Sequence, residues 1–166
     1  MKSSYFFVAA LLFLGAVFHN CTQQQNLQGE TKKDSLVKPV LNYAKYTNPD
    51  IYPNGGSELA VLMREMYDDT DLIKKAILNK ELPLDFRQKF TYLHWATPTD
   101  STTKTDAYPD MAKAFIDNLE ALYAEKDAEK RIKKFDIVIQ NCVSCHQGHC
   151  PGPIKKIKKL RITEHK

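Results

Sequence analysis

Two cysteines and a histidine in the run Cys142-Val143-Ser144-Cys145-His146 constrain this chain of 166 residues more than any other feature. Two thiols separated by two residues and followed at once by an imidazole form the attachment signature of c-type haem. The spacing has a chemical reason, because each thiol can add to one vinyl group of the same porphyrin. The imidazole is then held beneath the iron as an axial ligand. We therefore expect Cys142 and Cys145 to bind one covalent haem c and His146 to bind its iron.

Two other uses of such a cysteine pair are open at this stage. A zinc site needs four ligands, and the nearby candidates are only His149 and Cys150. A thioredoxin-like C-x-x-C opens a helix after a strand in a βαβ pattern. Here the pair instead closes a long stretch of helical pattern near the C-terminus, which favours haem.

Residues 1–20 have the pattern of a secretory signal. Lys2 supplies a positive start, and residues 5–18 are almost wholly apolar. This run is too short and ends too abruptly for a spanning helix. Covalent haem attachment of this kind occurs outside the bacterial cytoplasm, so the signal and the motif support each other. We expect a periplasmic or cell-envelope protein.

Cys21 stands where the apolar run ends. A signal that closes on a cysteine resembles a bacterial lipoprotein precursor, and that resemblance implies lipidation of Cys21 and attachment to a membrane surface. The polar residues 22–34 suit a flexible tether. The alternative is an ordinary cleaved signal with an incidental cysteine, because Phe18, His19 and Asn20 are not the small residues usual at a lipoprotein cleavage site.

The formal charge of +4 is concentrated at the C-terminus, where residues 154–166 hold six basic residues against the single Glu164. The simplest interpretation is a solvated end. The functional one is docking to acidic lipid headgroups or to an acidic redox partner. Ile154, Ile157 and Leu160 recur among the lysines, which indicates a short amphipathic helix lying on the protein or on a bilayer. Nucleic acid is not an expected partner of an exported chain.

The rest of the chain reads as one helical domain. Residues 21–56 form a tether and extended lead-in, residues 57–153 the haem-binding bundle, and residues 154–166 a basic tail. Apolar stripes and turn signals predict helices over residues 57–68, 70–80, 83–95, 109–126 and from 128 to the break at residues 151–153, with a loop over 97–106. The second of these segments either continues the first helix or bends from it near Asp69.

The last of these helices carries the motif on its apolar stripe. Its members Ile132, Phe135, Ile139, Cys142 and His146 are spaced by three and four residues. Strand signals are sparse. We therefore expect an all-α fold, an antiparallel four-helix bundle with covalently attached haem c in the last helix.

At this point the chain resembles the class II cytochromes c, the cytochrome c′ type. The resemblance rests on residues 57–66 as the first helix and on Cys142–His146 in the last helix. It implies thioether bonds at Cys142 and Cys145 and a proximal ligand at His146. It also implies that the first helix covers the distal side of the haem, which makes Met63 or Met66 the candidate distal ligand. Members are often homodimers.

Three functions are compatible with these residues. A His–Met pair keeps the iron six-coordinate and makes the protein an exported electron carrier with a redox protein partner. If Met63 and Met66 only pack, a five-coordinate iron binds NO or CO, for sensing or detoxification. A peroxidase needs a distal acid–base histidine, for which His94 is the candidate. We expect the monohaem electron carrier, which is not an enzyme.

Overall fold

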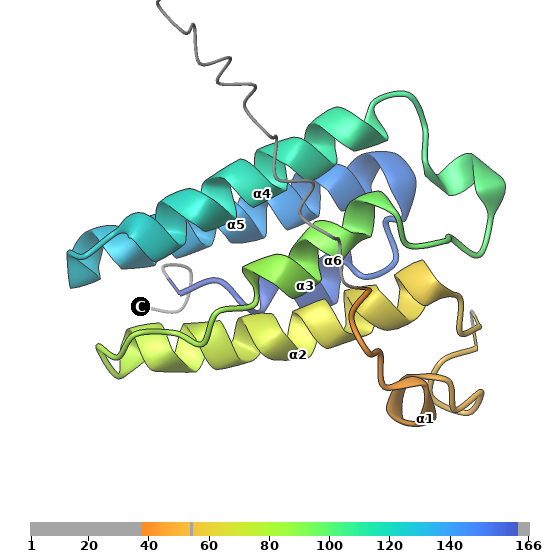
Figure 1. The fold of residues 1–166 in the computed structure, drawn as a ribbon, viewed down its shortest axis with the longest axis horizontal. Coiled ribbons are helices and arrows are strands. Elements are labelled where there is room, and N and C mark those ends of the chain that lie inside the picture. The colour runs from red at the N-terminus through yellow and green to blue at the C-terminus, as the bar shows by residue number, and fades with distance from the viewer. Residues whose placement is uncertain (1–37, 54, 163–166) are drawn as a thin grey trace, which may run out of the picture. The chain divides into compact units, whose positions relative to one another are not determined.

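Helices make up the regular structure of residues 38–53 and 55–162, the part of the chain that this computed structural model describes (Figure 1). Within these ranges there is no strand, as expected for an all-α chain. The predicted signal, Cys21 and nearly all of the tether lie outside the described residues, as do residues 163–166. No helix in the described ranges is both long enough and apolar enough to cross a membrane.

The first long helix, α2 (Glu58–Leu78), begins where the sequence predicts. The side chain of Ser57 accepts a hydrogen bond from Ala60 N and so caps the first turn. The sequence left open whether the segment from Thr70 continues this helix or bends from it near Asp69, and the structure has one continuous helix. Thr70 is compatible with the helix interior because its hydroxyl donates to Met66 O at 2.6 Å.

The helices α4 (Tyr108–Ala124) and α5 (Ala128–His149) lie side by side and are joined by a short connection (Figure 1). Pro109 occupies the first turn of α4, as predicted, because that position needs no backbone donor. Asp127 caps α5 by accepting from Lys130 N at 2.8 Å. The helix stops at Cys150, before the predicted break at Pro151.

The prediction of one helix over residues 83–95 is wrong in its length and its starting residue. Only α3 (Arg87–Thr91) and a following 3₁₀ turn (Tyr92–His94) form. The tertiary structure explains the late start, because the hydroxyl of Tyr123 donates to Leu84 O and accepts from Phe86 N. Those backbone groups are therefore satisfied by α4 and not by a helix of their own.

Two short elements were not predicted. The lead-in contains α1 (Tyr43–Tyr46), capped by the side chain of Asn42. The polar loop contains a 3₁₀ turn at Ser101–Thr103, where the carboxylate of Asp100 accepts from Thr102 N. Both depend on single side-chain caps, which a periodicity argument does not detect.

The described part of the basic tail packs with the body. The predicted amphipathic helix forms as α6 (Ile154–Lys158), which contacts α5. The apolar residues of the tail are buried on α6 and just after it, with Ile157, Leu160 and Ile162 between 4% and 7% exposed. Lys74, on α2, donates to the carbonyls of Lys159 and Arg161 at 3.0 and 3.1 Å. The apolar side of the tail therefore faces the protein and is not available to a bilayer.

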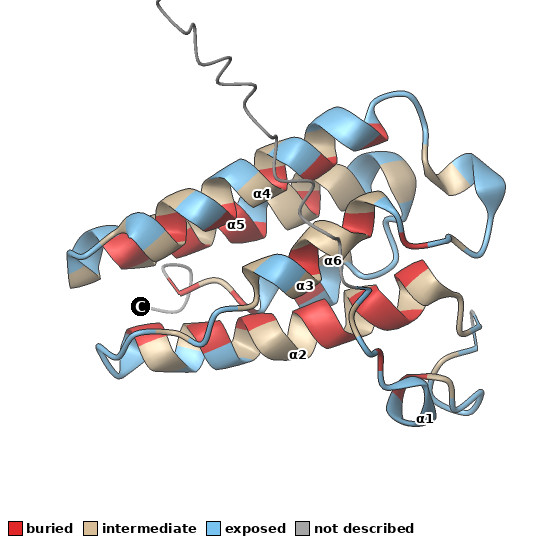
Figure 2. Cartoon of the chain, in the orientation of Figure 1, coloured by how far each residue is buried: buried red, intermediate tan, exposed pale blue. Residues whose placement is uncertain are grey.

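The core lies between the long helices. Figure 2 shows the buried residues on the sides of α2, α4 and α5 that are turned toward the interior. The largest side chains with almost no exposed surface come from α2, α3, α4 and α5: Leu62, Ile73, Phe90, Leu119, Leu122, Phe135 and Ile139. Burial of such side chains is worth about 1.5–3 kcal/mol each, so the helix faces that carry them define the fold.

A buried ion cluster joins α3 to α2, where its two acids stand on either side of Met66 in the sequence. Lys89 Nζ lies 2.8 Å from Glu65 Oε2 and 2.6 Å from Asp69 Oδ2. The two carboxylates are only 8% and 13% exposed. Burial raises the pKa of Asp69 above its ordinary value. The cluster is thus two desolvated acids held by one cation.

Lys89→Met is expected to lower the free energy of unfolding by about 3–5 kcal/mol at neutral pH, because it leaves two buried carboxylates without their cation. The loss should shrink as the pH falls. A carboxyl group with a raised pKa destabilises the fold while it is charged, and protonation removes that cost. Chemical denaturation at several pH values measures both effects.

The matched control is Lys75→Met on α2, since Lys75 pairs with Asp71 at the surface, where both side chains are more exposed than those of the cluster. Exposed pairs of this spacing contribute about 0.3–0.5 kcal/mol. Equal losses in the two variants would show that the Lys89 cluster is not buried as the structure has it.

Candidate cofactor site

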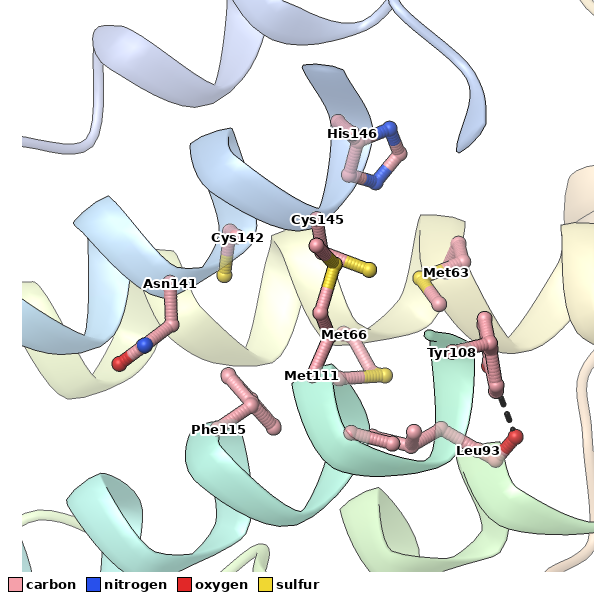
Figure 3. Close-up of a pocket in the computed structure, with 11 residues that line it drawn as sticks. Met63, Met66, Leu93, Tyr108, Met111, Phe115, Asn141, Cys142, Cys145 and His146 are labelled. Carbon is pink, nitrogen blue, oxygen red and sulfur yellow. Dashed lines mark hydrogen bonds between the residues drawn. The ribbon is translucent and has the colours of Figure 1, made fainter. Parts of the chain in front are cut away.

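The cysteine–histidine motif occupies the last two turns of α5, where it lines a pocket between helices (Figure 3). Sequence patterning placed Cys142 and His146 on the inward stripe, and the structure confirms that both border this pocket together with Cys145. The other lining residues come from α2, the 3₁₀ turn after α3, α4 and α5: Met63, Met66, Leu93, Tyr108, Met111, Ala112, Phe115 and Asn141.

Both thiols of the motif are free and half-buried. Burial raises the pKa of Cys142 to about 12, and it also raises the pKa of Cys145. Catalytic redox cysteines instead need a lowered pKa, commonly at a helix N-terminus. These two lie at the C-terminal end of α5 and remain protonated at neutral pH. The thioredoxin-like alternative is therefore not supported.

The imidazole of His146 is oriented by the backbone. Its Nδ1 lies 2.8 Å from Cys150 O, which can only accept a hydrogen bond. Burial lowers the pKa of His146, and the nearby His149 adds to this lowering, against the hydrogen bond to Cys150. A neutral ring with its proton on Nδ1 keeps a lone pair on Nε2, which is the form in which histidine binds a metal.

Three methionines, not two, reach the pocket. Met63 and Met66 on α2 were predicted, and Met66 is the more buried of the two, at 7% exposure. Met111 on α4 was not proposed as a site residue. Figure 3 shows its thioether in the same space as those of Met63 and Met66. Its signal was present, because Met111 and Phe115 share one stripe of α4.

Haem fits the chemistry of this lining. Haem c needs an apolar surround, two thiols for its vinyl groups and one imidazole for its iron, and all of these border the pocket. Tyr108 adds no free hydroxyl, since its OH donates to Leu93 O at 2.9 Å. The cavity itself is only about 40 Å³, so a macrocycle requires the lining side chains to move apart. Methionine has three flexible torsions and adapts readily to such a change.

His94 and His149 lie in different surroundings. His94 does not line the pocket, and it packs edge-on against Trp95. His94 was the predicted distal histidine of a peroxidase, and the structure does not bring it to the pocket. His149 contacts the ring of Tyr108 at 5.5 Å, and both of its buried ring nitrogens have no hydrogen-bond partner among the described residues.

Among the residues that the structure describes, no three side chains of the His, Cys, Asp or Glu types are grouped so as to hold a metal ion. The zinc site left open by the sequence has no counterpart in that part of the chain. No protein-family model, no curated protein and no solved structure matches this chain.

Proposed function

We propose that this chain is an exported c-type cytochrome that transfers electrons through one haem. Cys142 and Cys145 would hold the haem by thioether bonds, and His146 would be its proximal ligand. The observation that carries the proposal is that two free thiols and an imidazole oriented by a backbone carbonyl border the same methionine-lined pocket.

Each part of the site has a role in that function. When bound, haem supplies an iron that changes between the ferrous and ferric states. The cysteines fix its position, and His146 presents Nε2 to the metal. The apolar lining excludes water, which favours a raised reduction potential. A His–Met pair would leave no open coordination position for a substrate, so the role we propose is a carrier and not an enzyme.

The likeness to class II cytochromes c belongs to the same proposal. In it, α2, α3 with its 3₁₀ turn, α4 and α5 are the four helices of an antiparallel bundle, and the third is short. The order of these helices and the motif near the end of α5 support it. Export by residues 1–20, anchoring through Cys21, a redox protein partner and a homodimer complete the proposal.

An absorption spectrum tests the proposal directly. The protein should be made in a host that attaches haem c, purified, reduced and scanned with and without CO. A covalent haem chromophore is expected, with sharp split visible bands if the ferrous iron is six-coordinate and low-spin. A colourless protein at its bare polypeptide mass would refute the proposal.

Replacing the methionine that binds iron with leucine should convert the six-coordinate form into a five-coordinate form that binds CO. Met63→Leu and Met66→Leu are the two candidate variants, and Met111→Leu is the matched control from α4. Each exchange conserves volume and should cost less than about 1.5 kcal/mol of stability, so the spectrum reports ligation and not unfolding.

The alternative function is gas binding by a five-coordinate haem, and the burial of Met66 in the core favours it, since buried methionines often serve only to fill space. In that case wild-type protein binds CO and all three leucine variants keep the wild-type spectrum. If only Met111→Leu gave a new CO-binding form, the distal ligand would be Met111 on α4 and not a methionine of α2.

A further inference from the structure

The hydrogen bond from His146 to Cys150 depends on how α5 ends. Cys150 N still donates to His146 O at 3.0 Å, as in a helix. The φ and ψ angles of Cys150, −155° and 83°, are however not helical. A residue before proline is disfavoured in the helical region, so Pro151 accounts for this change. In a continued helix the carbonyl of Cys150 would lie along the axis. Here it lies against the imidazole of the same turn.

The chain after Pro151 packs against the helices, and these contacts fix the position of the turn. Ile154 N donates to Pro151 O at 3.1 Å, which begins α6. Ile157 and Leu160 are buried against the core. Ile162 N then donates to Asp136 Oδ1 on α5 at 2.9 Å. The segment is thus attached at both ends of its path across the protein.

We propose that residues 150–162 are a positioning strap that holds His146 in the Nδ1–H form and aims its Nε2 at the pocket. Cys150 acts through its backbone carbonyl, and its exposed thiol takes no part. The strap thereby gives the C-terminal segment a function besides solubility or docking. The form of the ring does not depend on haem, whereas its effect on iron rests on the proposed function.

The effect on iron follows from the same hydrogen bond. A ring that donates Nδ1–H to a carbonyl is a more basic ligand through Nε2. A more basic ligand favours the ferric state and lowers the reduction potential. Loss of the bond should therefore raise the potential of the bound haem without removing the haem.

The first measurement needs no haem. The full chain, made without haem attachment and labelled with ¹⁵N, is examined by NMR at mildly alkaline pH, where the ring is neutral. His146→Gln identifies the signals of the ring. We expect protonated Nδ1 and unprotonated Nε2. A predominant Nε2–H form would overturn the proposal, and this outcome is independent of whether the protein ever binds haem.

The second measurement uses the haem-loaded protein. Pro151→Ala lets Cys150 adopt helical angles, whereas Pro153→Ala is the matched control, since it changes an exposed proline of the same turn and leaves Cys150 before a proline. We expect a higher midpoint potential in Pro151→Ala only. Equal potentials in wild type and Pro151→Ala, or equal shifts in both variants, would overturn the proposal.

Discussion

Replacing Cys142 and Cys145 together with serine is expected to remove all covalently bound haem from the purified protein. Serine is close to cysteine in size but cannot form a thioether with a vinyl group. Mass spectrometry under denaturing conditions should give the bare polypeptide mass, and acidic organic solvent should extract any remaining colour. Each single variant is expected to keep one thioether and therefore to keep haem in smaller yield.

Cys150→Ser is the matched control for this experiment. Cys150 lies a few residues beyond the motif, and its thiol is free and exposed. The control should retain the haem and the mass of wild type. A double variant that still carries haem covalently, or a control that loses it, would mean that the attachment sites are assigned to the wrong cysteines.

Ending the chain after Pro153 is expected to leave a protein that is mostly unfolded. The truncation removes Ile157, Leu160 and Ile162 from the core, each at most 7% exposed. At about 1.5–3 kcal/mol for each buried aliphatic side chain, the loss approaches the whole stability of a typical domain, about 5–15 kcal/mol. Thermal unfolding followed by circular dichroism measures it.

The control for the truncation keeps the apolar side of the tail and changes only its charge. Lys155, Lys158 and Lys159 are exposed, and their replacement by glutamine should change stability by less than about 0.5 kcal/mol at each site. A truncated protein that melts like wild type would show that the tail does not belong to the core. Loss of partner binding in the glutamine variant alone would instead assign a docking role to the lysines.

The sequence predicted the helical class and the ends of several helices because those signals are local. Ser57 and Asp127 cap helices through their own side chains, and Pro109 and Pro151 restrict their own backbone. The same local reasoning failed for the helix expected at residue 83. Its start is decided by the hydroxyl of Tyr123, which belongs to another helix.

The residues of the candidate site also fall into those that local sequence patterns predicted and those that depend on tertiary packing. The three donors of the motif follow from spacing along one helix, and the periodicity of α5 predicted that Cys142 and His146 face inward. Met111 was missed because it enters the pocket from α4, and nothing in the sequence aligns α4 with α2 and α5. The partner of His146 was missed because its hydrogen bond is made by a backbone carbonyl, whose direction depends on the turn at Pro151.

The sequence by itself therefore determined which side chains share a helix face and which donors stand at the end of α5. Only the tertiary structure decided that three methionines meet those donors and that the basic tail buries its apolar side in the core. The physical reason is that helix periodicity and capping act within a few residues. Which faces meet is decided by the simultaneous packing of all the helices.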